Sequence, residues 1–213
     1  MEATHRWHKL PDDVKSQILD DHRYWNVDDL EWWDGVYDGF KEDMKAIGIE
    51  VDTIYFSGFY SQGDGACFEG CVRDWGLFLK SLGYDDPLFI KHFSQCAEFA
   101  VRHRGHYYHE NCTSFSAEFH LPEDYDEEEF LLLYGCGEEL RDAALIAVLS
   151  HPENSSGALE AQFTEAFKDH MRDLYHRLEE DYEYLTSDEV VLESLEANDM
   201  LDELIEEVLE LEE

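Results

Sequence analysis

Residues 52–70 read DTIYFSGFYSQGDGACFEG, which is an extended stretch, a turn and a second extended stretch. From Val51 the side chains alternate with a period of two, and both alternating sets contain aromatic residues. This pattern predicts a strand that is buried on both faces. The turn is Gln62 to Gly65, whose glycines supply positive φ, and Ala66 to Val72 is the returning strand. The stretch therefore predicts a β-hairpin.

Helical patterns lie on both sides of this hairpin. Pro11 opens a short helix, and Asn26 caps a longer one that Gly48 ends. A short helix at Trp75–Leu82 closes at Gly83, and Pro87 opens another that continues to Val101. Further helices are predicted at 130–149, 159–184 and 188–211.

A second extended pattern at His106–Phe119 completes a small antiparallel sheet of about three strands. The order of elements predicts an α+β fold with a helical C-terminal half. We expect two parts: an α+β core domain of residues 1–185, and an acidic helical extension of residues 186–213 that packs on the core or projects from it.

The charge balance of the chain is strongly acidic. It has 52 Asp and Glu against 15 Lys and Arg, a formal charge of -37 at pH 7. Such a surface repels nucleic acid and attracts proteins that bind nucleic acid. Composition alone also fits a halophilic origin, but the acids are bunched, since residues 105–140 contain no Lys or Arg.

The C-terminal tail is the extreme of this charge. Residues 178–213 contain no Lys or Arg, and sixteen of these 36 residues are Asp or Glu. A single helix of that length would carry one carboxylate per roughly 3.4 Å, which is about the phosphate spacing along one strand of duplex DNA. The tail therefore favours DNA mimicry.

Segments for secretion or membrane insertion are not expected. Residues 1–10 lack an apolar core, and no run approaches 18 apolar residues. The five cysteines are odd in number and sit mostly in apolar surroundings, which is typical of reduced thiols in a cytoplasmic protein.

Three patterns invite chemical interpretations. The Gly-rich turn at 62–65 has neither the Lys nor the following helix of a phosphate cradle. The adjacent acid pairs have no nucleophile beside them, so we expect no catalytic residue and no cofactor. A zinc site is left open at four residues spaced by three: His103, His106, His109 and Cys112.

The end of the tail carries an apolar stripe with helical spacing, formed by Leu201, Leu204, Ile205 and Val208. Most stripes of this kind dock on the core of their own chain. Because this one lies near the chain end, it is also a candidate surface for a homodimer.

The hairpin block resembles a recurrent DIYFSGFxSQGDGAxFxG pattern of small phage and prophage proteins described as antitoxin-like. Residues 32–43 and 174–189 are similar to the same family, and the resemblance spans residues 25–198. It implies a phage-associated protein that acts in the host cytoplasm by binding another protein. Residues 198–213 depart from the family, which has a short polar segment there.

The leading hypothesis is a non-enzymatic, phage-type inhibitor that presents a DNA-like acidic surface to a basic host protein or defence protein. It is expected to bind neither nucleic acid nor a membrane. The first alternative is an antitoxin that binds its toxin through an apolar patch, and the second is a metal-dependent hydrolase. The predicted partner-binding residues are Asp126, Glu127, Glu128, Glu129, Glu179, Glu180, Asp181, Glu183, Glu203, Glu206 and Glu207.

Overall fold

The computed structural model describes residues 6–28, 31–85, 97–119 and 152–211, together with Pro87, Ile90 and Ser94. The chain forms two compact units. We call residues 37–176 the sheet unit, and residues 1–36 with 177–213 the helical unit. The α+β fold and the helical C-terminal half are as predicted. The expected boundary at 185/186 falls at the end of a helix, but residues 186–213 share their unit with the N-terminal segment.

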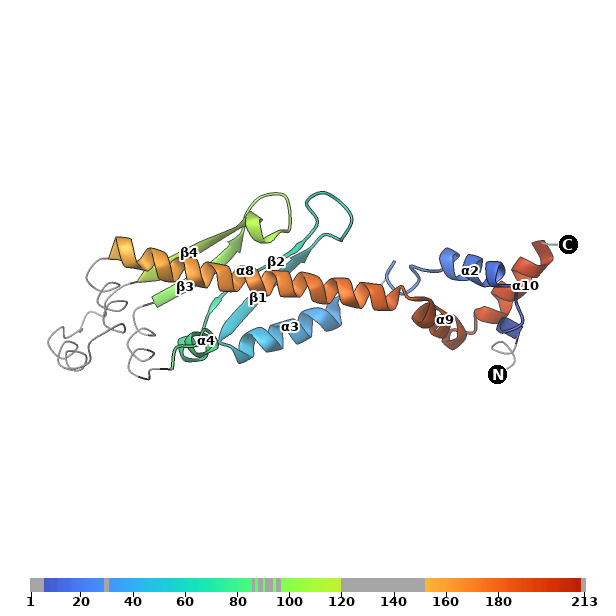
Figure 1. Ribbon diagram of the computed structural model, residues 1–213, viewed down its shortest axis with the longest axis horizontal. Helices are drawn as coiled ribbons and strands as arrows, with labels where there is room; N and C mark the ends of the chain where they lie inside the picture. The colour runs from blue at the N-terminus through green and yellow to red at the C-terminus, as the bar shows by residue number, and fades with distance from the viewer. Residues whose placement is uncertain are drawn as a thin grey trace. The chain divides into compact units, whose positions relative to one another are not determined.

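The sheet unit contains four antiparallel strands in the order β1-β2-β3-β4 (Figure 1). Their bounds are β1 Ile49–Phe56, β2 Ala66–Val72, β3 Ala97–His103 and β4 Thr113–Phe119. The extra strand is β3, whose residues were predicted to end a helix. In β3, Phe99 and Val101 are buried while Glu98 and Arg102 are exposed. The side chains thus alternate with a period of two, and the segment pairs with β2 on one side and β4 on the other. It is therefore a strand rather than the end of a helix.

The predicted hairpin is confirmed, with β1 and β2 paired from Phe56↔Ala66 to Ile49↔Val72. Asp64 organises the loop, since its Oδ2 accepts a hydrogen bond from the Ser61 amide at 2.6 Å. Gly63 has φ +96° and could not carry a Cβ, which would meet the Tyr107 ring at 2.3 Å. The turn thus requires glycine for both its conformation and its packing.

Helices cover one face of the sheet. They are α3 (Asp34–Ala46), α4 (Trp75–Ser81) and the residues up to 176 of α8 (Pro152–Leu185). The Phe68 ring lies 5.6 Å from Phe40 of α3 and 5.7 Å from Phe167 of α8, between ring centroids. Phe99 of β3 extends this aromatic core to Phe163, with a centroid distance of 5.7 Å.

The opposite face of the sheet carries charges. Arg102 pairs with Asp52 at 3.1 Å and lies 3.8 Å from Glu69. The prediction that the first strand is buried on both faces is therefore wrong, because the side chains of this face pair with each other at the surface. Its aromatic member, Tyr55, stacks on Tyr108 with ring centroids 5.2 Å apart.

The start of α3 also differs from the sequence prediction. The helix begins at Asp34 rather than after Asn26. Instead of capping it, Asn26 donates a hydrogen bond from Nδ2 to the Leu185 carbonyl at 3.0 Å, where α8 ends. The helix ends near Gly48 as predicted, and Gly48 has a positive φ of +86°.

Several predicted helices have revised bounds. The helix predicted at 159–184 begins earlier, at Pro152, and the segment 188–211 is divided into α9 (Asp188–Ala197) and α10 (Leu201–Leu211). Asp199, with φ 58°, lies at the break. The helix predicted at 130–149 and most of the one predicted from Pro87 lie outside the described residues.

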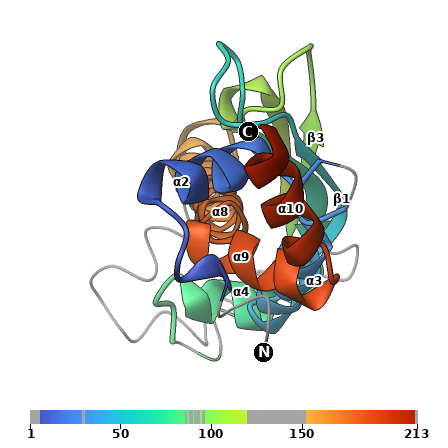
Figure 2. The ribbon, with the colours of Figure 1, turned by 90° about the vertical axis from the view of Figure 1, so that its right-hand side faces the viewer.

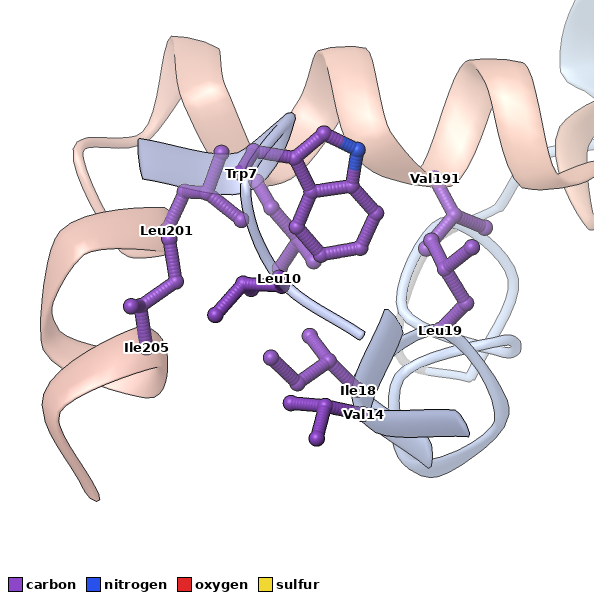
Figure 3. Packing of buried hydrophobic residues seen from close by; sticks show 9 residues of the cluster. Trp7, Leu10, Val14, Ile18, Leu19, Val191, Leu201 and Ile205 are labelled. Atoms are coloured by element: carbon purple, nitrogen blue, oxygen red, sulfur yellow. The ribbon is translucent and has the colours of Figure 1, made fainter. Parts of the chain in front are cut away.

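The helical unit is built from α2 (Asp12–Asp21), the last residues of α8, α9, α10 and the turn at residues 6–10 (Figure 2). Side chains from α2, the turn, α9 and α10 converge on one cluster, as Figure 3 shows. Its buried members are Trp7, Leu10, Val14, Ile18, Leu19, Val191, Leu195, Leu201 and Ile205.

Within the described residues, no helix combines the length and the apolar character that crossing a membrane requires.

Candidate functional site

The predicted acidic residues that the structure describes all lie in the helical unit. Glu179, Glu180, Asp181 and Glu183 occupy the end of α8, and a second group occupies α10. The α10 group is Glu203, Glu206 and Glu207. Asp126, Glu127, Glu128 and Glu129 lie outside the described residues.

The helical unit is more acidic than the rest of the chain. Its 73 residues contain 25 acidic and 5 basic side chains, a formal charge of -20. The 140 residues of the sheet unit carry -17. The helical unit therefore holds more than twice the negative charge per residue, and both described acidic groups belong to it.

On α10, the burial of one face determines which carboxylates face solvent. Leu201 and Ile205 are each only 1% exposed, packed against Trp7 and its neighbours. Glu203 and Glu207, four residues apart on the same side of the helix, are exposed. Neither makes a hydrogen bond or an ion pair with any side chain that the structure describes.

The same packing bears on the two interpretations of the apolar stripe. Leu204 and Val208 pack against the cluster that buries Leu201 and Ile205. Leu201 and Ile205 thus dock on their own chain, while Leu204 and Val208 are only partly buried. A homodimer through the stripe stays a prediction.

Basic side chains of the helical unit hold its segments together. Arg6 Nη1 lies 3.3 Å from Asp202 Oδ1 and 3.1 Å from Glu206 Oε1, so it joins the N-terminal turn to α10. Of the predicted α10 acids, Glu206 is thus partly engaged within the chain.

Arg23 makes the corresponding connection to α9. It contacts Asp20 at 2.6 Å, Asp188 at 3.0 Å and the Thr186 carbonyl at 3.1 Å. Hydrogen bonds from Asp20 and then Asp188 raise the pKa of the Arg23 guanidinium. Arg6 and Arg23 therefore connect segments of this unit to one another.

The α8 group presents two kinds of carboxylate. Glu180 and Glu183 are exposed and three residues apart, so they share one side of the helix. Asp181 is half-buried, and burial raises the pKa of its carboxyl. Its neighbour Tyr182 packs on Trp32, with ring centroids 5.6 Å apart. Glu180 and Glu183 are thus the better placed residues for a partner.

The histidine-rich segment makes local structural contacts. His103 Nε2 lies 3.2 Å from the Tyr107 carbonyl, and His109 Nδ1 accepts from the Asn111 amide at 3.1 Å. In the described parts of the chain, no group of three or more His, Cys, Asp and Glu side chains could hold a metal ion.

A small cavity of about 80 Å³ lies beside the hairpin loop, where the hydrolase alternative would place its chemistry. Asp64 is held in the turn, and Arg172 contacts Glu110 at 3.3 Å, Glu165 at 2.6 Å and Asp169 at 2.6 Å. These polar groups are thus engaged in holding the loop, the 110–112 turn η1 and α8.

The sequence interpretation missed the roles of Arg6 and Arg23. Arg23 follows the acid pair Asp20-Asp21, and that contrast was an available signal, whereas the sequence around Arg6 is not acidic. Their partners lie 196 and 165 residues away, so only the folded chain identifies them.

Comparison with known proteins gives one family. A model described as a domain of unknown function (DUF8835) matches residues 32–188, which is most of the chain. No curated protein and no solved structure matches. The match includes the hairpin and the α8 acids but ends before α10.

Proposed function

The chain belongs to the DUF8835 family, whose description states no activity, so we propose a function from the chain's own charges. It is a phage-type inhibitory protein whose helical unit binds a basic nucleic-acid-binding protein of the host, or an anti-phage defence protein, in place of DNA. It acts by binding rather than catalysis, in the host cytoplasm. The antitoxin-like resemblance of residues 25–198 supports a role in protein binding.

One observation carries this proposal. The helical unit has a formal charge of -20, and Arg6 and Arg23 are engaged in ion pairs within the unit itself. Glu180 and Glu183 on α8, and Glu203 and Glu207 on α10, are left exposed. Rows of carboxylates on rigid helices suit a groove that normally binds phosphates.

The expected mechanism is competition with nucleic acid. Carboxylates of the helical unit pair with the Lys and Arg side chains of the target that would otherwise bind phosphates. The opposite charges of the two proteins also accelerate their association. Affinity then depends steeply on salt, because exposed charges more than about 8 Å apart are largely screened at physiological ionic strength, and this distance shortens as salt rises.

The test is a pull-down from host lysate at low salt, with elution by a salt ramp from about 50 to 500 mM NaCl. The captured protein is then tested for release of a labelled DNA duplex by the acidic chain. We expect a basic, nucleic-acid-binding protein that elutes within the ramp and loses its DNA to the inhibitor.

A matched pair of variants locates the surface. The first replaces Glu180, Glu183, Glu203 and Glu207 with Gln. The control removes four exposed charges of the sheet unit, through D38N, D85N, E98Q and E118Q. Both change the net charge equally, so only the first should abolish binding. Equal loss in both, or a capture without any basic protein, contradicts the proposal.

The antitoxin alternative is favoured by exposed aromatic side chains at the hairpin loop. Tyr60 is 83% exposed and Tyr107 is 50% exposed, next to the block that carries the resemblance. A toxin bound there would stay bound at about 500 mM NaCl and be lost in Tyr60→Ser. The four Gln substitutions would leave that complex intact.

A further inference from the structure

The sheet unit contains a cavity of about 500 Å³ bordered by α3, β1, α4 and the end of β2. Its volume lies within the roughly 300–1,000 Å³ of small-molecule sites. The side chains that matter are Lys41, Lys45, Glu50, Arg73, Asp74 and Leu77. This cavity lies within the family-matched residues and outside the acidic groups discussed above.

A close backbone contact fixes the frame of the cavity. The Gly48 carbonyl accepts hydrogen bonds from the amides of Arg73 at 2.8 Å and Asp74 at 3.0 Å. A Cβ on Gly48 would lie 2.1 Å from the Asp74 carbonyl oxygen, so only glycine permits this approach. The end of α3 is thereby held beside the end of β2, and the cations of both segments line one cavity.

Carboxylates at the cavity are already engaged. Glu50 accepts a hydrogen bond from Arg73 Nε, and this bond raises the pKa of the Arg73 guanidinium. Asp74 Oδ1 accepts from the Leu77 amide at 3.0 Å and caps α4. Neither carboxylate contacts a lysine of the cavity.

The two lysines of the cavity are exposed. Lys41 and Lys45 lie four residues apart on α3, and neither forms a hydrogen bond or ion pair with a residue that the structure describes. Like charges at this spacing destabilise a helix. The terminal nitrogens of Arg73 are likewise outside its contact with Glu50. Three cations around one cavity therefore have unused binding capacity in a chain that is otherwise acidic.

We propose that this cavity binds a small organic phosphate, with the phosphate on Lys41, Lys45 and Arg73. A multiply charged phosphate can accept bonds from several cations at once, and the guanidinium fork suits its geometry. The apolar part of the ligand rests on Leu77, which is 41% exposed, and on Val51. Exposed acids on α3, Asp38 and Glu42, oppose a longer polyanion such as nucleic acid. This site is independent of the proposed inhibitory function.

The test is isothermal titration calorimetry of the full chain at low salt with ADP, pyrophosphate and adenosine as probes. We expect saturable binding of ADP, weaker binding of pyrophosphate and none of adenosine. The variant K41Q/K45Q should bind ADP at least about tenfold more weakly, since each charge-assisted hydrogen bond contributes roughly that factor.

The matched control is K9Q/K80Q, which also removes two exposed cations, neither of which lines the cavity. It should leave the affinity for ADP unchanged. Circular dichroism melts check that the lysine variants remain folded, as expected for exposed positions. Absence of saturable ADP binding up to about 10 mM, or equal weakening by K9Q/K80Q and K41Q/K45Q, overturns the proposal.

Discussion

The sheet unit and the helical unit are each stabilised internally, by different kinds of contact. The sheet unit has an aromatic core in which Phe68 and Phe99 of the sheet pack on rings from α3 and α8. The helical unit has a small aliphatic cluster around Trp7, and ion pairs of Arg6 and Arg23 cross between its helices. With a formal charge of -20, it folds against its own repulsion, so each of those contacts matters more.

The largest effect is expected from removing the part of the cluster that α10 provides. Leu201→Ala should lower the free energy of unfolding of the helical unit by about 2–5 kcal/mol, because it leaves a cavity beside Trp7. Hydrogen exchange by mass spectrometry should show faster exchange in residues 6–23 and 188–208, with β1 to β4 unchanged. Faster exchange across the whole chain would mean that the two units do not respond separately.

A truncation after Asn198 would remove the acids of α10, but it would also remove Leu201 and Ile205 from the cluster. Loss of a partner after truncation would not separate charge from folding, which is why Glu→Gln substitutions are the sharper test.

A second prediction addresses the sheet unit, where close packing rather than charge sets stability. Gly48→Ala should destabilise this unit by about 2–4 kcal/mol, since it combines positive φ with a severe clash. Gly39→Ala, in the open middle of α3, should instead stabilise it by about 0.5–1 kcal/mol. Urea denaturation followed by circular dichroism compares the two, and equal effects would contradict the role assigned to the Gly48 contact.

A third prediction tests the cations of the helical unit. Arg23→Met should cost about 1–2 kcal/mol at low salt, through lost bonds to Asp20, Asp188 and Thr186. The cost should shrink at about 500 mM NaCl as the remaining acids are screened. Lys9→Met removes an exposed cation that makes no ion pair with described residues, and it should have little effect. Similar losses from both variants would point to net charge alone.

The smallest effect is expected at Asp181, whose pKa is raised by burial. Because this pKa is higher in the folded than in the unfolded chain, the ionised carboxyl of Asp181 lowers the stability of the folded chain at pH values above the folded pKa. Asp181→Asn should therefore stabilise the protein at pH 7 by less than about 1 kcal/mol. This gain should fade as pH drops toward the ordinary value of 3.8.

Exposed Glu180 supplies the control for that measurement. Glu180→Gln makes the same change in net charge without relieving burial, so the difference between the two variants isolates the buried carboxyl. Urea midpoints that are identical for both variants at pH 7 would contradict the assignment.

Local patterns predicted much of this fold. The hairpin at 52–72, the glycine turn and the start of α2 follow from period and turn chemistry. Residues 97–103 were misassigned because a short apolar run fits both helix and strand, and pairing with β2 and β4 decided it. Asn26 was misassigned because its partner, the Leu185 carbonyl, lies 159 residues away.

The residues of the candidate site were predicted only from where acidic residues cluster along the sequence. Clustering along the chain found the acids of α8 and α10, because neighbouring helical residues stay neighbours in space. Two other arrangements could not be predicted from the spacing of residues along the sequence, because their members are far apart in the chain. They are the ion pair of Glu206 with Arg6, and the placement of Lys45 and Arg73 around one cavity.

The core of the helical unit also has a consequence for synthesis. Arg6 and Asp202 are separated by 196 residues, and Trp7 needs Leu201 and Ile205 to be covered. At roughly 5–20 residues per second, the N-terminal turn waits about 10–40 s on the ribosome before its partner helix exists. During that interval the exposed Trp7, Leu10 and Val14 are a natural substrate for chaperones, while the hairpin of the sheet unit can already form.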